Sequence, residues 1–253
     1  MRDRVERLHA TQGFLGSVVQ LMDVELPIPD YSTVSRRQGG LEPELRPAPA
    51  SVPRPVAIDS TGLKVYGVGE WYLRKHGMRR GRRRIWRKLH LGVDETTKEI
   101  VAVDLTTSQI HDSHQLPDLL DRTPDDVAQV SGDKAYDCRG CYASILERGA
   151  EPTIPPRRRA RLCRDAEPPL PKAARDRVLR RIAAHRRYNW RVTSGATRQS
   201  LAENAVSRFK ALVGVKLTAR TFENQRIEAL VKCGVLNRVS VLGLPRSERI
   251  QLG

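Results

Sequence analysis

The sequence predicts an α/β protein in which a mixed sheet is flanked by helices and preceded by a small helical segment. Three apolar, alternating runs follow one another with only turn residues between them, which is typical of an antiparallel meander. Helical and strand-like segments then alternate, as they do where further strands extend a sheet through crossover helices. The chain has 253 residues, enough for one large domain and a smaller appendage with a well-buried core.

The helical segment is expected over residues 1–37. Apolar residues recur at helical spacing along its first part, two prolines end that helix, and Asp30 or Ser32 can cap a second one. The pair is either the remainder of a DNA-binding helix-turn-helix or a plain helical hairpin packed on the domain behind it. Residues 38–55 are rich in Pro and Gly and are interpreted as a linker.

The main domain is expected over residues 56–245, followed by a tail at 246–253. Its strands are predicted in the segments "PVAIDSTGLKVYG", "RRIWRKLHLGVD", "KEIVAVDLTTSQ", "DVAQVSGDKAYD" and "AEPTIPPR". Helices are predicted in "HDSHQLPDLLDR", in "CRGCYASILERG", which Gly149 closes, and through most of the final third. A segment rich in Pro and Arg, at about 155–198, is interpreted as a basic insertion containing one helix.

The charge balance indicates a polyanionic partner. Lys and Arg number 45 against 29 Asp and Glu, which gives a net charge of +16. Nucleic acid is the first candidate and an anionic membrane surface the second, while a high-GC genome rich in Arg codons is the alternative explanation. No apolar run is long enough to span a bilayer, and the N-terminus does not resemble a secretory signal.

The four cysteines fit a reducing compartment better than a disulfide framework. Cys138 and Cys141 form a CxxC motif. A structural zinc site needs a second pair of ligands, and only Cys163 and scattered histidines are available for it. The sequence assigns no role to this motif.

Three carboxylates form a candidate metal site. Asp59 lies in "VAIDSTGLK" and by alternation faces opposite to Ile58; Asp133 follows a later strand in "VSGDKAYD"; Glu203 lies in the helical stretch "SLAENAVSRFKALVG". Cleaving or joining a DNA strand requires an activated oxygen nucleophile and a stabilised leaving oxygen on opposite sides of phosphorus. Two Mg²⁺ ions held by hard oxygen ligands supply both.

Each acid has a structural alternative. Asp59 precedes "STG" and suits a turn, while Asp133 suits a turn or a helix cap, with Asp137 as a competitor. Glu203 and Ser200 match a capping box, in which the glutamate reaches back to the first amide of its helix.

Glu203 and Lys210 are expected on one face of that helix, two turns apart, where the lysine can bind a DNA phosphate beside the acids. A solvated Glu–Lys face is the alternative. The apolar side of the helix is predicted to consist of Leu201, Ala205, Leu212 and the flank of Phe209.

A basic hairpin is the strongest candidate for binding DNA. "WYLRKHGMRRGRRRIWRKLH" contains nine Lys and Arg residues together with three large aromatics. The charges suit phosphates and the aromatics suit unpaired bases, although a solvated charged hairpin is the alternative. The candidate DNA-binding residues, besides Lys210, are Arg198, Arg79, Arg80, Arg82, Arg83, Arg84 and Trp86. His90 in its alternating strand is expected to be packed, and His111 and His114 to be surface residues.

From about Leu21 to Pro245 the sequence resembles bacterial DDE transposases of the insertion-sequence-five family. The resemblance is carried by "AIDSTGLKVYGVGEWYLRKHG", "RIWRKLHLGVDETTKEIVAVDLT", "GDKAYD" and "SLAENAVSRFK". It implies a ribonuclease-H-like catalytic fold, with Asp59, Asp133 and Glu203 as the three catalytic acids and metal ligands. It also matches Lys210 to the lysine of the family signature.

The resemblance further implies an enzyme that cleaves and joins DNA at insertion-sequence ends with two Mg²⁺ ions, for which Mn²⁺ can substitute. It implies terminal inverted repeats and target DNA as partners, a homodimer on paired ends, no membrane, and a place in the bacterial cytoplasm at the nucleoid.

The sequence departs from the family pattern in two respects. Ala196 and Gln199 occupy the positions of a signature Tyr and Arg, with Arg198 adjacent, and relatives usually carry more sequence at the N-terminus. A truncated, inactive copy that only binds DNA is therefore the alternative function, and a nuclease without strand transfer is a further one.

Overall fold

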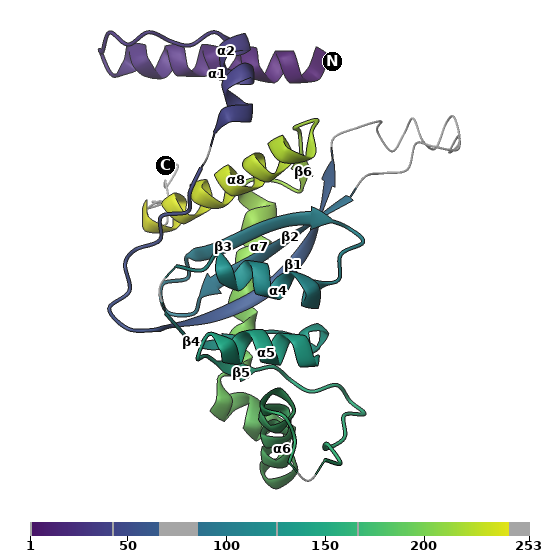
Figure 1. Cartoon of the computed structure of the whole chain (residues 1–253). Helices are drawn as coiled ribbons and strands as arrows, with labels where there is room; N and C mark the ends of the chain where they lie inside the picture. The colour runs from purple at the N-terminus through teal and green to yellow at the C-terminus, as the bar shows by residue number, and fades with distance from the viewer. Residues whose placement is uncertain (1, 42, 66–85, 125, 166, 243–253) are drawn as a thin grey trace, which may run out of the picture.

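A computed structural model of the chain describes residues 2–41, 43–65, 86–124, 126–165 and 167–242. Its centre is a mixed sheet of six strands (Figure 1). The strands are β1 (Arg54–Val65), β2 (Trp86–Asp94), β3 (Ile100–Thr107), β4 (Val127–Ser131), β5 (Glu151–Thr153) and the short β6 (Lys216–Leu217). All but β6 lie in segments for which the sequence predicts a strand.

The sheet combines an antiparallel meander with a parallel extension. Its order is β3-β2-β1-β4-β5, and β6 pairs with the C-terminal end of β1. β1, β2 and β3 are antiparallel neighbours, whereas β4 runs parallel to β1 and β5 runs parallel to β4. This confirms the predicted α/β class and is consistent with a ribonuclease-H-like fold.

Helices cover both faces of the sheet. α4 (Asp112–Asp121), α5 (Arg139–Glu147) and part of α6 (Leu170–Ser194) share one core with Val56 and Ile58 of β1. α7 (Ser200–Leu212) and α8 (Phe222–Leu242) share the other with Ala57 and Leu63. The alternation of these β1 side chains is what places an apolar surface on each face.

Several local predictions are confirmed. Gly149, with φ of +71°, ends α5, and glycine takes this left-handed conformation without strain. His111 caps the N-terminus of α4 with its side chain, and both His111 and His114 are exposed. His90 is packed in β2, with 1% of its surface exposed.

The segment predicted as a basic insertion with one helix contains α6, which a kink at Arg186 (φ +65°, ψ 152°) divides into two helical parts. α6 packs against α5 and against the 3₁₀ helix η3 (Ala196–Gln199), which leads directly into α7. Val178 and Trp190 of α6 form a small core with Ala196 of η3. This core holds the start of α7 in place.

The N-terminal segment is a helical hairpin of α1 (Arg2–Leu21) and α2 (Tyr31–Arg37), drawn together in purple in Figure 1. Asp30 caps α2, because its Oδ1 accepts a 2.8 Å hydrogen bond from the amide of Ser32. α2 continues into the 3₁₀ helix η1 (Gln38–Gly40), which contacts α8. Residues 43–53 contain neither helix nor strand, whereas both ends of the segment 38–55, predicted as a linker, lie in η1 and β1.

Among the helices of the described ranges, none combines the length and the apolar character needed to cross a membrane.

Candidate active site

Asp59 lies within β1 and faces α7. Its neighbours in alternation, Ala57 and Leu63, belong to the core under α7, whereas Ile58 belongs to the core on the other face. This is the orientation expected from alternation. The alternative of a turn at this position is wrong, because β1 continues without interruption to Val65.

Asp133 follows the C-terminal end of β4, beside the part of the neighbouring strand β1 that contains Asp59. β4 is parallel to β1 with Ala57 opposite Ser131, so each acid comes two residues beyond the same paired position. One oxygen of Asp133 accepts a 2.7 Å hydrogen bond from the amide of Ala135 and caps the 3₁₀ helix η2 (Lys134–Tyr136). The cap predicted as an alternative therefore exists and uses Oδ1.

Asp137, the competing acid, has a structural role. It is buried, and its carboxylate binds the Arg175 guanidinium at 2.7 and 3.1 Å and the Arg157 amide at 2.8 Å. These bonds attach α6 and the preceding loop to the end of η2. Asp137 is thus saturated by protein donors, while Asp133 is not.

Glu203 is exposed in the first turn of α7 and does not cap the helix. The capping-box alternative is wrong, because η3 runs into α7 and residue 199, at the cap position, has helical backbone angles and no side-chain cap bond. Glu203 and Lys210 are both exposed, as predicted for a shared face.

The predicted apolar side of α7 requires a correction. α7 packs on β1 and β2 through Ala202, Ala205, Val206 and Phe209. Leu212, placed on that side from the sequence, is 58% exposed. At ~100° per residue, Leu212 falls at the flank of the face formed by these four residues, which leaves it in solvent.

The electrostatics connect the acids. Burial raises the pKa of Asp59 to about 6, and the negative charges of Glu203, Asp133 and Asp112 add to that rise, while the amide of Ser60 opposes it. Within the described ranges, none of Asp59, Asp133 and Glu203 has a lysine or arginine partner. The ionised form of Asp59 is therefore short of positive charge.

The donor set suits a divalent cation such as Mg²⁺ or Mn²⁺, because carboxylate oxygens are the hard ligands these ions prefer. Within the part of the chain that the structure describes, however, no three His, Cys, Asp or Glu side chains stand close enough together to hold a metal ion as they are placed. The acids are neighbours in one electrostatic field without forming a ready-made coordination sphere.

Asp112 is a fourth acid that the sequence reasoning missed. Its Oδ1 accepts a 2.8 Å hydrogen bond from Ser60 Oγ and lies 3.0 Å from Lys88 Nζ, on the face of the sheet opposite to Glu203. Burial works against its ionisation, but these two donors outweigh burial and lower its pKa. An acid at the first position of the helix predicted in "HDSHQLPDLLDR" was the available signal.

Ser60 connects Asp59 on one face of the sheet with Asp112 on the other. Its side chain binds Asp112, and its amide donates a 2.8 Å hydrogen bond to Oδ1 of Asp59. His90 is the register partner of Ser60 on β2, and burial lowers its pKa to about 4, so its ring is neutral at pH 7. The polar cluster behind Asp59 consists of Ser60, Lys88, His90 and Asp112.

The predicted DNA-binding residues fall in three situations. Lys210 is exposed on α7, and Trp86 begins β2 with Lys64 Nζ 5.5 Å from the centre of its ring. Arg198 forms a 3.1 Å ion pair with Glu95, whose side chain is 1% exposed. The five arginines of the basic hairpin, Arg79, Arg80, Arg82, Arg83 and Arg84, lie outside the described residues.

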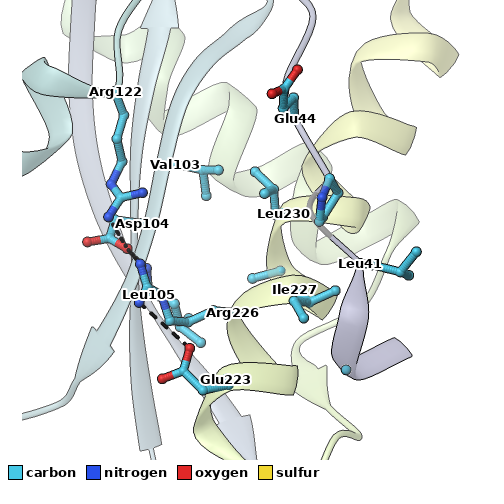
Figure 2. A pocket seen from close by; sticks show the side chains of 13 residues that line it. Leu41, Glu44, Val103, Asp104, Leu105, Arg122, Glu223, Arg226, Ile227 and Leu230 are labelled. Atoms are coloured by element: carbon cyan, nitrogen blue, oxygen red, sulfur yellow. Dashed lines mark hydrogen bonds and ion pairs between the residues drawn. The ribbon is translucent and has the colours of Figure 1, made fainter. Parts of the chain in front are cut away.

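A cavity of about 500 Å³ lies away from the acids, between β3, α8 and the end of η1. Figure 2 shows Asp104 in its wall between Arg122 and Arg226, whose guanidinium nitrogens lie 3.8 and 3.5 Å from Oδ1 of Asp104. Leu41, Ile227 and Leu230 provide apolar lining. Its wall has paired charges, unlike the acids of β1, β4 and α7.

Comparison with known families gives two matches. A family model described as a transposase DDE domain matches residues 50–238, and a second model with the same description matches residues 7–68. The first match covers the whole sheet, both helical layers and all three predicted acids. No solved structure matches the chain.

Proposed function

Because the chain belongs to the DDE transposase family, whose members are DNA phosphoryl-transfer enzymes, we propose that Asp59, Asp133 and Glu203 are its catalytic acids. The observation that carries the proposal is the state of Asp59. It is partly buried in the middle of the central strand β1, the like charges of Glu203 and Asp133 oppose its ionisation, and no cationic side chain of the described residues compensates it. A carboxylate in this state gains most from a bound cation.

Enzymes of this family use divalent metal ions, and the three acids would hold two Mg²⁺ ions, with Mn²⁺ as a substitute. When bound, such a pair activates an oxygen nucleophile and stabilises the leaving oxygen at phosphorus.

The protein's own groups fix the acids and the DNA. The Ser60 amide orients the Asp59 carboxylate, and Asp112 accepts a hydrogen bond from the Ser60 hydroxyl on the other face of the sheet. Together the two bonds fix the Asp59 side chain relative to β1. The amide of Ala135 holds one oxygen of Asp133 and leaves the other for a ligand. Lys210, exposed on the face of α7 that bears Glu203, would bind a phosphate of the DNA backbone.

The finer assignments belong to the same proposal. The DNA would be the terminal inverted repeats of an insertion sequence of the insertion-sequence-five group, together with its target. Two copies of the chain would act on paired ends, and the basic hairpin over residues 71–90 would contact the transposon end through its arginines and aromatics.

The test is a strand-transfer reaction. Pre-cut double-stranded ends, taken from the DNA that flanks this coding sequence, are incubated with a supercoiled target plasmid and Mg²⁺. We expect joined products from the wild type and none from Asp133→Asn, with Asp121→Asn, an exposed acid at the end of α4, as the matched control. Cleavage without joined products from the wild type would instead indicate a nuclease.

A further inference from the structure

The CxxC motif lies directly beside the loop that carries Asp133. Cys138 is the N-terminal cap residue of α5 and makes no side-chain cap bond, and Cys141 lies within the first turn of that helix. Their sulfur atoms are 3.4 Å apart, and both thiols are free. The zinc site considered from the sequence finds no support, since within the described residues no cluster gathers enough ligands for a metal.

The two thiols differ in access. Cys141 has no exposed surface, and burial raises its pKa. Cys138 is partly exposed and lines a cavity of about 280 Å³ between α5 and α6, together with the basic residues Arg139 and Arg161. Neither of these arginines has an acidic partner among the described residues. Lys172 and Arg175 also line the cavity, against Asp137 and Asp176, so its charge is net positive and favours an anionic reactant.

We propose that Cys138 and Cys141 are a redox-active pair that forms a reversible disulfide, with an anionic low-molecular-weight disulfide of the glutathione class as its oxidant. The geometry supports this, because the two sulfur atoms already lie 3.4 Å apart as thiols, and side-chain rotation can bring them toward the roughly 2 Å of an S–S bond.

The reaction balances in two exchanges. The Cys138 thiolate attacks one sulfur of the small disulfide, forming a mixed disulfide and releasing one small thiol. The Cys141 sulfur then attacks the Cys138 sulfur and breaks the mixed disulfide, and the proton of the Cys141 thiol goes to the departing thiolate, so that the internal disulfide forms and the second small thiol is released. The protein loses two electrons and two protons, and the small disulfide gains them.

Oxidation would act on the acid site through two short connections. The amide of Cys138 bonds to the carbonyl of Tyr136 at 2.7 Å, and Tyr136 ends the 3₁₀ helix that Asp133 caps. The thiol of Cys141 also lies 3.4 Å from the carbonyl of Ser113, next to Asp112. A disulfide consumes that S–H donor and shifts Cys138 toward α5, so the loop that positions Asp133 must adjust. This consequence rests on the proposed function, whereas the disulfide itself does not.

The first measurement is the mass of the full-length protein after incubation with oxidised glutathione and quenching with an alkylating reagent. The variant Cys163→Ser/Cys233→Ser retains only the proposed pair. We expect wild type and this variant to lose two hydrogen atoms and to leave Cys138 and Cys141 unalkylated, reversibly with dithiothreitol. Cys138→Ser and Cys141→Ser should not lose them. In the folded pair-only variant, a stable glutathione adduct on Cys138 or full alkylation of both thiols would overturn the proposal.

The second measurement compares Mg²⁺-dependent cleavage by the oxidised and reduced forms of the pair-only variant, with Cys138→Ser treated in the same way. We expect oxidation to lower cleavage at least tenfold in the pair-only variant and not in Cys138→Ser. If the disulfide forms and cleavage is unchanged, the link to Asp133 is wrong. If neither form of any variant cleaves, the failure lies with the proposed function, and the mass measurement still decides the disulfide.

Discussion

At the scale of single residues, burial and neighbouring negative charges disfavour the ionised form of Asp59. Its pKa of about 6 means that between about pH 4 and 6 the folded chain keeps a proton that the unfolded chain has released. The free energy of unfolding therefore falls as the pH rises through this window. The full shift corresponds to about 3 kcal/mol, and solvent screening of a partly exposed carboxylate reduces it to about 1–2 kcal/mol.

We therefore expect Asp59→Asn to be more stable than the wild type by about 1–2 kcal/mol at pH 7.5 without metal, and equal to it near pH 4. Urea denaturation at the two pH values measures this difference. A variant that is less stable than the wild type at pH 7.5 would show that Asp59 is satisfied by protein donors and is not strained by burial and like charge.

Asp112 is expected to act through Ser60. Asp112→Asn removes the charge that holds Lys88 and weakens the bond from Ser60, so we expect metal-dependent cleavage to fall about 10- to 100-fold with DNA binding unchanged. Asp118→Asn, an exposed acid of the same helix, is the control.

The pairing is tested by combining variants. Ser60→Ala should lower cleavage to a similar degree, and the double variant with Asp112→Asn should be little worse than either single one, because both remove the same link. If the losses in the two single variants add in the double variant, or if Asp112→Asn cleaves as well as the wild type, Asp112 does not act through Ser60.

At the scale of elements, one ion pair connects η3 to the sheet. Arg198 of η3 lies 3.1 Å from Oε2 of Glu95, and Ser131 of β4 donates to the other oxygen at 2.5 Å. Glu95 is almost fully buried, so losing Arg198 leaves a charge with one donor. Because Glu95 is buried, its ion pair with Arg198 has a structural role. Arg198 itself is half exposed, which leaves it accessible for the DNA contact predicted from the sequence.

Arg198→Ala should therefore lower the free energy of unfolding by about 2 kcal/mol, and Glu95→Gln in the same chain should restore most of it by removing the unpaired charge. Chemical denaturation of the single and double variants measures this. If Arg198→Ala weakens DNA binding with unchanged stability, then its role is the DNA contact alone.

The elements also separate what local sequence can predict from what it cannot. The strands of the meander and the helices of both layers were predictable, because alternation and helical spacing depend on neighbours in sequence. The capping box at Ser200 was wrong, because η3 continues the chain into α7 and leaves no free cap position. β6 was missed because two residues carry no periodic signal, and Asp112 because its partners are 24 and 52 residues away.

At the scale of the whole molecule, the net charge of +16 favours binding to the polyanionic backbone of DNA. Binding should be strongly salt-dependent, because each phosphate contact releases counterions. We expect Lys210→Ala to weaken binding to transposon-end DNA and to reduce the slope of log affinity against log salt by about one. Arg238→Ala, at an exposed position of α8, is the control and should leave the slope unchanged. Fluorescence anisotropy over a salt series measures both. An unchanged slope for Lys210→Ala would remove it from the interface.

The three acids come from three elements far apart in the chain, and only the fold brings them into one field. β1 contributes one, the end of its parallel neighbour β4 contributes the second, and α7 contributes the third from the covering layer. Nothing in the fold or in the family comparison supports the alternative of an inactive copy, and the departures at Ala196 and Gln199 leave all three acids in place.

The central claim is tested most directly by Mg²⁺-dependent cleavage of a supercoiled plasmid that carries the DNA flanking this coding sequence. The comparison uses the wild type, Glu203→Gln, and Glu147→Gln as an exposed helical control, with DNA binding measured in parallel. Cleavage by the wild type and the control, lost at least a thousandfold in Glu203→Gln with binding intact, is the predicted result. Equal cleavage by Glu203→Gln, or binding without any wild-type cleavage, would contradict the assignment of these acids as the catalytic site.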